Sequence, residues 1–210
     1  MKPILFSTPM VRAILDGRKT QTRRAIKYDF ESVYSAASQQ GIMDKVCQYG
    51  ELPSDAIEWY AKNIAKPKYK PGDVLWVRET WSRDESGEYV YRTNYGTTED
   101  DSFPPSMFKW KPSIHMPREA ARIFLRVTNV RVERLQEITP KDAWEEGCRI
   151  GNFFPWEKHI PELQQQCRDI LFKSLWDGLN AKRGYGWDIN PWVWVYEFER
   201  VSEDGSSKDE

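Results

Sequence analysis

Histidine and cysteine are both scarce in this sequence of 210 residues. There are two histidines, His115 and His159, and three cysteines, Cys47, Cys148 and Cys167. The histidines lack the spacing of a metal-binding motif, and the cysteines are widely spaced and odd in number, which argues against a disulfide framework and a zinc ribbon. We therefore expect reduced thiols, no metal site and no Ser-His-Asp triad. Any catalysis would use lysine, carboxylate, hydroxyl or arginine side chains.

Long apolar runs are also missing. No segment approaches the roughly 18 consecutive apolar residues of a membrane span, and the amino-terminal residues reach charged positions before any long apolar stretch. Neither a GxGxxG fingerprint nor a P-loop is present, so no nucleotide cofactor is expected. The sequence predicts a cytoplasmic protein that has no cofactor and does not associate with membranes.

The sequence has no large net charge, because its 31 basic residues are balanced by 32 acidic ones. The charges are nevertheless unevenly distributed along the chain. Residues 1–27 contain seven basic residues and one acidic residue, whereas residues 203–210 read EDGSSKDE. A local basic patch, rather than the total charge, determines the field that a phosphate ligand meets. The amino-terminal region is therefore a candidate surface for an anionic ligand.

Aromatic residues, in contrast, are plentiful, and ten of them are tryptophans. Large rings supply much of the apolar area in a chain with modest aliphatic content. We expect Trp76, Trp176, Trp192 and Trp194 to fill the interior, whereas Trp110, between two lysines in a turn-rich segment, is a candidate for an exposed contact.

Short apolar segments at a period of two residues predict five or six β-strands. The expected strands cover residues 3–7, 74–77, 89–93, 121–135 and 192–201. The alternation slips near Thr128 and Asn129, which indicates a bulge or a turn. Helices interrupt these strands without a βαβ rhythm, so we expect an α+β fold built on a small mixed β-barrel.

Helical patterns account for most of the remaining chain. Helices are expected directly after Thr8-Pro9, around 29–40 and 54–65, after Thr139-Pro140, and over 161–180. We interpret residues 1–201 as one domain with additions near 28–66, 94–113 and 148–160, the first of them helical. Residues 202–210 are expected to be a disordered acidic tail.

Four motifs follow one another in a recognisable order. They are GRKTQTRR at 17–24, GDVLWVRE at 72–79, a DAxxEG pattern at 142–147, and WVWVYEFERV at 192–201. In this order they resemble the ASCH domain family, which belongs to the PUA-like superfold of small β-barrels associated with RNA. The longer form seen here is similar to ASCH proteins of bacteriophages and prophages. The resemblance implies that the domain recognises RNA or a modified nucleoside.

The resemblance also implies a catalytic group. In family members that remove the acetyl group from N4-acetylcytidine, the matching positions are Lys19, Thr22 and Glu146. Thr22 would act as the nucleophile or position a water molecule, Lys19 would activate it, and Glu146 would move a proton to the leaving amine. Arg24 would hold the substrate.

Ordinary structural roles also fit these residues. The run of charges at 18–24 is typical of a solvated strand, and Glu146 could be a helix acid that interacts with the helix dipole. A lysine that is removed from water inside a barrel would instead have a lowered pKa and could act as a base, and a nearby arginine would lower that pKa further.

Further substrate contacts are expected from Arg23, Arg78 and Trp81. Arg78 and Trp81 lie at the end of the GDVLWVRE strand, where a base could stack on the ring and a phosphate could meet the cation. Two alternatives remain open at this point. The protein could be an RNA-binding protein or ribonuclease without amidohydrolase activity, or a phage accessory protein that binds a host protein.

Overall fold

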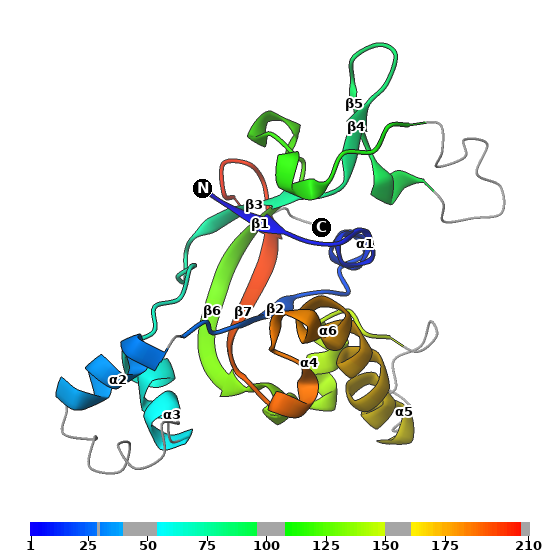
Figure 1. Cartoon of the computed structure of the whole chain (residues 1–210). Helices are drawn as coiled ribbons and strands as arrows, with labels where there is room; N and C mark the ends of the chain where they lie inside the picture. The colour runs from blue at the N-terminus through cyan, green and yellow to red at the C-terminus, as the bar shows by residue number, and fades with distance from the viewer. Residues whose placement is uncertain (29, 40–53, 96–107, 150–160, 207–210) are drawn as a thin grey trace.

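The computed structural model of the chain describes residues 1–28, 30–39, 54–95, 108–149 and 161–206. These residues form an α+β fold with one five-stranded and one two-stranded sheet. The strands are β1 (Lys2–Leu5), β2 (Gln21–Ala25), β3 (Val74–Arg78), β4 (Trp81–Arg83), β5 (Tyr89–Tyr91), β6 (Phe124–Arg134) and β7 (Trp192–Val201). The helices are α1 (Thr8–Leu15), α2 (Phe30–Gln39), α3 (Ser54–Asn63), α4 (Pro140–Glu145), α5 (Pro161–Gln166) and α6 (Lys173–Asn180) (Figure 1).

The larger sheet has the strand order β1-β3-β6-β7-β2. The β1–β3 pair is parallel and the other pairs are antiparallel. The strands predicted from the sequence at 74–77, 121–135 and 192–201 are confirmed as β3, β6 and β7. The pairing of β6 with β7 shifts register between Val127 and Asn129, at the position where the sequence alternation slips. A bulge of this kind bends the strand that carries it, and β6 curves visibly in Figure 1.

The sequence predicts a small mixed β-barrel, but the described strands form a mixed sheet that does not close into a barrel. Strands β1 and β2 form the two edges of the larger sheet, and they are not hydrogen-bonded to each other. A side chain bridges them instead, because Nη2 of Arg24 on β2 donates to the carbonyl oxygen of Leu5 on β1 at 2.9 Å. The backbone hydrogen bonds of the larger sheet therefore leave it open between β1 and β2.

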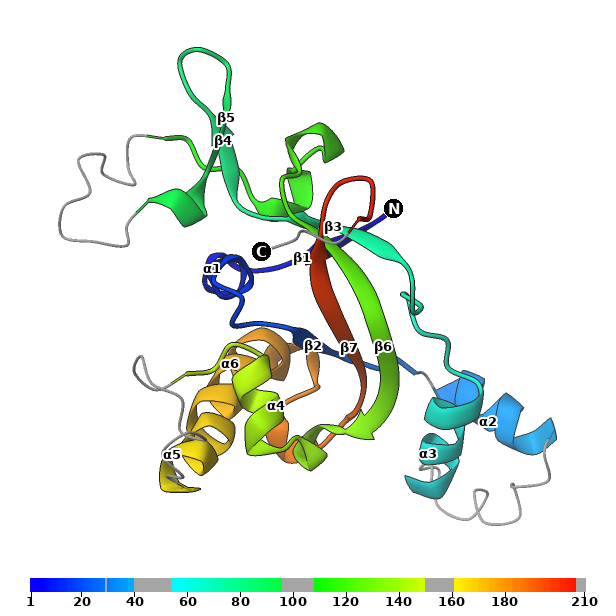
Figure 2. The same cartoon turned by 180° about the vertical axis from the view of Figure 1, so that it is seen from behind.

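Two apolar cores flank the larger sheet. The first includes Val11 and Ile14 of α1 packed against Leu75, Leu125 and Phe198 of the sheet. The second lies under α4 and the segment 161–180, and it includes Leu135, Trp144, Phe172, Trp176 and Val195. Helices α2 and α3 lie at one end of the molecule, and the β4–β5 hairpin lies at the opposite end (Figures 1 and 2).

The helix predicted over 161–180 is confirmed as one continuous element, which we call the α5–α6 helix. Its middle turns, Cys167–Phe172, have π-helical hydrogen bonding. A π-helical segment inserts extra residues per turn, so it changes which side chains of α6 face the sheet. Phe172 and Trp176 are buried in this arrangement.

Several sequence expectations concern segments around these elements. The helices predicted near 29–40 and 54–65 are confirmed as α2 and α3, whereas residues 40–53 between them lie outside the described residues. Most of the expected addition at 94–113 and nearly all of that at 148–160 also lie outside them. The expected acidic tail covers residues 202–210. Its first part forms a turn in which the Ser202 amide donates to the Ser206 carbonyl, and residues 207–210 lie outside the described residues.

Most of the tryptophan and cysteine side chains discussed above lie in the interior of the protein. Trp76, Trp176 and Trp192 are buried, as predicted, and Trp194 is partly buried. Cys148 and Cys167 are buried thiols, and Cys47 lies outside the described residues. Burial raises the pKa of the Cys148 thiol to about 12, so this thiol remains protonated. Within the described part of the chain, no helix is long and apolar enough to cross a membrane.

The DAxxEG motif forms helix α4 and the turn that ends it. Thr139 is the N-cap, its side chain accepts a hydrogen bond from the Asp142 amide, and Asp142 completes a capping box, as the Thr-Pro pair predicts. Gly147 follows the helix with a φ of +93°, a conformation that glycine adopts without strain. A Cβ at Gly147 would lie 3.0 Å from the Cβ of Ala13 and 3.5 Å from that of Lys19. The glycine therefore lets the end of α4 approach both α1 and the basic motif.

We expect Gly147→Ala to destabilise the protein by about 1–3 kcal/mol, because alanine is strained at this φ and its methyl group meets Ala13. Urea unfolding followed by tryptophan fluorescence would measure the change. Gly178→Ala is the matched control, since a Cβ there meets nothing within 4 Å in the exposed part of α6. It should stabilise the protein by about 0.5–1 kcal/mol. Equal stability of the two variants would contradict this role for Gly147.

Candidate functional site

The basic motif connects α1 to β2 through a tight turn. Gly17, with a φ of +66°, ends α1, and the amides of Arg18 and Lys19 both donate to the Ala13 carbonyl, at 2.7 and 2.9 Å. Lys19 then forms an isolated antiparallel bridge with Glu146, immediately after α4. The turn thus places the lysine of the GRKTQTRR segment beside the glutamate of the DAxxEG segment.

Lys19 and Glu146 form a buried ion pair. The ammonium group of Lys19 donates to Oε2 of Glu146 at 2.5 Å, to the Glu146 carbonyl at 2.9 Å, and to the Gln21 carbonyl at 2.9 Å. The two side chains are 0% and 3% exposed. All three ammonium hydrogens therefore have acceptors inside the protein.

Burial lowers the pKa of Lys19 below its ordinary value. The carboxylate of Glu146 opposes this shift, because it stabilises the ammonium form, whereas the nearby charge of Arg24 adds to the lowering. The sequence interpretation of a desolvated lysine, rather than a solvated strand, agrees with this environment.

Arg23 holds the other oxygen of the same carboxylate. Its Nη1 lies 3.2 Å from Oε1 of Glu146, and its Nε donates to Oε1 of Glu133 at 2.8 Å. The side chain of Arg23 is 0% exposed, and Asp142 lies 3.6 Å from Nη2. The structure therefore places Arg23 inside an ion-pair network that fixes Glu146 between two cations.

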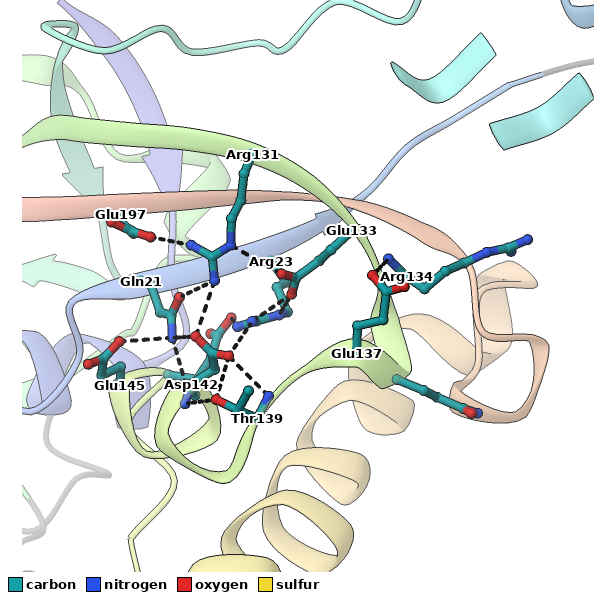
Figure 3. A network of polar contacts seen from close by, with 12 residues as sticks. Gln21, Arg23, Arg131, Glu133, Arg134, Glu137, Thr139, Asp142, Glu145 and Glu197 are labelled. Carbon is teal, nitrogen blue, oxygen red and sulfur yellow. Dashed lines mark hydrogen bonds and ion pairs between the residues drawn. The ribbon is translucent and has the colours of Figure 1, made fainter. Parts of the chain in front are cut away.

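A wider polar network supports this pair from the side of α4 (Figure 3). Nε2 of Gln21 donates to Oδ1 and to the carbonyl oxygen of Asp142, and Nη2 of Arg131 lies 3.1 Å from the same Oδ1. Arg131 also contacts Glu133 and Glu197. Burial alone would raise the pKa of Asp142, but hydrogen bonds from Thr139 and Gln21 and the charge of Arg23 outweigh it and lower this pKa to about 2.

A cavity of about 1190 Å³ opens beside this network. Thr22, Arg24 and Glu146 all line it, so the structure brings the threonine and the glutamate of the expected catalytic group to one cavity. Lys19 does not line the cavity, but it forms an ion pair with Glu146, which does. The guanidinium of Arg24 lies 5.3 Å from the ring centroid of Phe6.

Aromatic rings form much of the cavity wall. They include those of Phe6, Tyr69, Phe172, Trp176, Trp194 and Tyr196. Tyr69 donates its hydroxyl hydrogen to the Pro3 carbonyl at 2.7 Å and packs edge-on against Tyr196, so these two rings are held in place. We call Thr22 and Glu146, the two polar residues of the expected catalytic group that line the cavity, its polar base. Together with the aromatic rings, they suit a flat heteroaromatic ligand.

Two expected substrate-binding residues lie elsewhere. Nε of Arg78 donates to the Met116 carbonyl at 3.1 Å, and its guanidinium stacks over Trp76. Trp81 is buried against Met116 and Ala120. Neither Arg78 nor Trp81 lines the cavity, because the strand that leads to them turns into the β4–β5 hairpin.

The sequence interpretation did not include several residues that line the cavity. Trp194 and Tyr196 are two residues apart on β7, so the period-two pattern could have placed them on one face of the sheet. Lys68 and Arg183 lie far apart in the sequence, and only the tertiary structure brings them to the same cavity. Among the described residues, no group of three or more histidine, cysteine or acidic side chains could hold a metal ion.

Comparisons with known proteins give little further information. No family model matches the sequence, and no curated protein matches it. Among solved structures, the fold is similar to the crystal structure of protein EF3133 from Enterococcus faecalis V583, described as family DUF984, with 12% identity and a TM-score of 0.33. The similarity covers 90% of this chain and 65% of that protein. Such a low TM-score carries no functional argument.

We expect a strong energetic coupling between Lys19 and Glu146. Lys19→Met should destabilise the protein by about 3–5 kcal/mol, because it removes one partner of a buried ion pair. The double variant Lys19→Met/Glu146→Gln should be more stable than the sum of the single changes implies, with a coupling of about 1–3 kcal/mol. Urea unfolding of the four proteins would measure this coupling.

The exposed pair Glu58–Lys62 provides the control, since its atoms are 2.6 Å apart but the side chains are about half exposed. Its coupling should be about 0.3–0.5 kcal/mol. Additive effects at Lys19 and Glu146 would show that their contact does not hold the site together.

A second prediction concerns the pH dependence of stability. Asp142→Asn should cost about 1 kcal/mol at pH 7, because it weakens the capping box. The Asp142 carboxyl takes up its proton at higher pH in the unfolded chain, at about 3.9, than in the folded protein. Its stabilising contribution is thus complete above about pH 4, and it should disappear as the pH falls towards 2.

Unfolding curves of the wild type and of Asp142→Asn should therefore converge between about pH 4 and pH 2. Asp188→Asn is the control, because its side chain is 87% exposed and contacts only Lys173 among the described residues. A constant difference between wild type and Asp142→Asn across this range would rule out a strongly lowered pKa at Asp142.

Proposed function

We propose that this cavity binds a nucleoside, free or within RNA, and that Thr22, Lys19 and Glu146 hydrolyse an amide on its base. The observation that carries the proposal is the joint position of Thr22 and the Lys19–Glu146 pair at the base of one aromatic cavity. The sequence motifs suggest N4-acetylcytidine as the substrate. The relationship to ASCH domains and to PUA-like barrels is part of this proposal.

The three side chains would divide the work according to their contacts. Because all three ammonium hydrogens of Lys19 already have acceptors, Lys19 would act through Glu146 rather than directly on the substrate. The carboxylate of Glu146 would take a proton from the attacking oxygen and return it to the leaving nitrogen. Thr22 would supply that oxygen itself or position a water molecule.

The proposed reaction balances without a cofactor. An oxygen nucleophile attacks the carbonyl carbon of the acetyl group, the bond between this carbon and N4 breaks, and N4 receives the proton. One water molecule is consumed overall, and the products are acetate and cytidine. If Thr22 is the nucleophile, the water molecule cleaves the resulting threonine ester.

RNA binding without hydrolysis is a second candidate. It is favoured by the basic side chains that line the cavity, among them Arg24, Lys68 and Arg183. Contacts between cations and phosphates would make such binding weaker as the salt concentration rises. Binding of RNA that does not change with salt would count against this candidate.

We expect the purified protein to release acetate from N4-acetylcytidine, measured by chromatography of the nucleoside products. Glu146→Gln should reduce the rate at least about 100-fold, because it removes the group that transfers the proton. Thr22→Val, which keeps the branched shape but lacks the hydroxyl, should also reduce the rate. Glu145→Gln is the control, since Glu145 directly precedes Glu146, as the last residue of α4, but does not line the cavity.

Circular dichroism and thermal unfolding of each variant would separate loss of activity from loss of fold. If the folded wild type shows no turnover, N4-acetylcytidine is rejected as the substrate. If the folded Glu146→Gln variant retains the wild-type rate, or if Glu145→Gln loses as much activity as Glu146→Gln, the proposed role of Glu146 is wrong.

A further inference from the structure

The cavity has an excess of positive charge that the hydrolytic group does not use. The described residues that line it include six basic side chains, Arg23, Arg24, Lys27, Lys66, Lys68 and Arg183, and one carboxylate, that of Glu146. Glu146 is already balanced by Lys19 and Arg23. Among the described residues, none of the other five cations forms an ion pair within the protein. A neutral base needs no such field, whereas an anionic group does.

Two of these cations come from different elements that line the cavity. Arg24 extends from β2, and Arg183 follows α6 in the short turn Ala181–Arg183. Among the described residues, the Arg24 side chain donates one hydrogen bond, from Nη2 to the Leu5 carbonyl, so its other donors are available to a ligand. Burial lowers the pKa of Arg24, and the charge of Arg183 contributes to this lowering, which indicates that the two guanidinium groups repel each other.

Lys68 belongs to the segment between α3 and β3. Its backbone amide donates to the hydroxyl of Tyr196 at 3.2 Å, which fixes this segment to β7 beside the aromatic wall. Its side chain is exposed and lines the cavity. All three cations line the same cavity as the rings that could stack on a base.

We propose that the cavity contains a phosphate-binding subsite formed by Arg24, Arg183 and Lys68, so that its ligand is a phosphorylated nucleoside rather than a neutral one. This inference rests on the proposed binding of a nucleoside in the same cavity. Guanidinium groups bind phosphate oxygens through paired hydrogen bonds, and an anion between Arg24 and Arg183 removes their mutual repulsion. The phosphate can belong to a mononucleotide or to a strand of RNA.

Isothermal titration calorimetry of the full chain with cytidine, cytidine 5′-monophosphate and a short cytidine oligoribonucleotide tests this subsite. We expect at least one phosphorylated ligand to bind about tenfold more tightly than cytidine. Arg183→Gln should remove most of this advantage, so that the phosphorylated ligand binds about as weakly as cytidine. Lys182→Gln is the matched control, because Lys182 is the exposed neighbour in the same turn and does not line the cavity.

Each outcome has a separate meaning. If the monophosphate binds more tightly than cytidine and this gain depends on Arg183, the subsite binds a phosphate monoester. If only the oligonucleotide shows such a gain, the subsite binds a phosphodiester. Equal affinity for cytidine and both phosphorylated ligands, unchanged in Arg183→Gln, overturns the subsite while nucleoside binding stands. If no ligand binds, both the subsite and the proposed function are rejected.

Discussion

The ion pair between Lys19 and Glu146 joins two parts of the chain that are 127 residues apart. It links the turn after α1 to the end of α4, and Arg23 holds the second carboxylate oxygen from β2. Removing two such charges from water is costly, so the arrangement depends on complete hydrogen bonding of both groups. The capping box of α4 and the close packing at Gly147 keep the carboxylate at this position.

The cavity beside this pair combines three environments. Its base is polar, its walls are aromatic, and its remaining charged groups are basic. The lysine that is buried behind the base differs from the cations that line the cavity, because its hydrogens are fully used inside the protein. Chemistry at the base and recognition of an anion would thus fall to separate groups. Their separation makes it possible to test catalysis and binding independently.

Much of the fold follows from local patterns in the sequence, whereas the assembly of the site does not. The alternation in β6, including its slip near Asn129, and the Thr139-Pro140 start of α4 are local signals that predict what is found. The open sheet could not be predicted, because whether β1 pairs with β2 depends on contacts distant in sequence. The proximity of Lys19 and Glu146 is expected only from the resemblance to ASCH domains, because nothing in their spacing along the sequence predicts it. The position of Arg183 in the cavity depends on the course of the whole α5–α6 helix.

The titration of Lys19 is the most direct test of the buried ion pair at the base of the cavity. It can be followed by NMR of protein labelled with ¹³C at the lysine Cε, with the Lys19 signal assigned from its absence in Lys19→Met. Because burial dominates, the pKa of Lys19 should lie below the ordinary lysine value of about 10.4. A Lys19 pKa at or above the ordinary value would contradict a desolvated lysine behind Glu146.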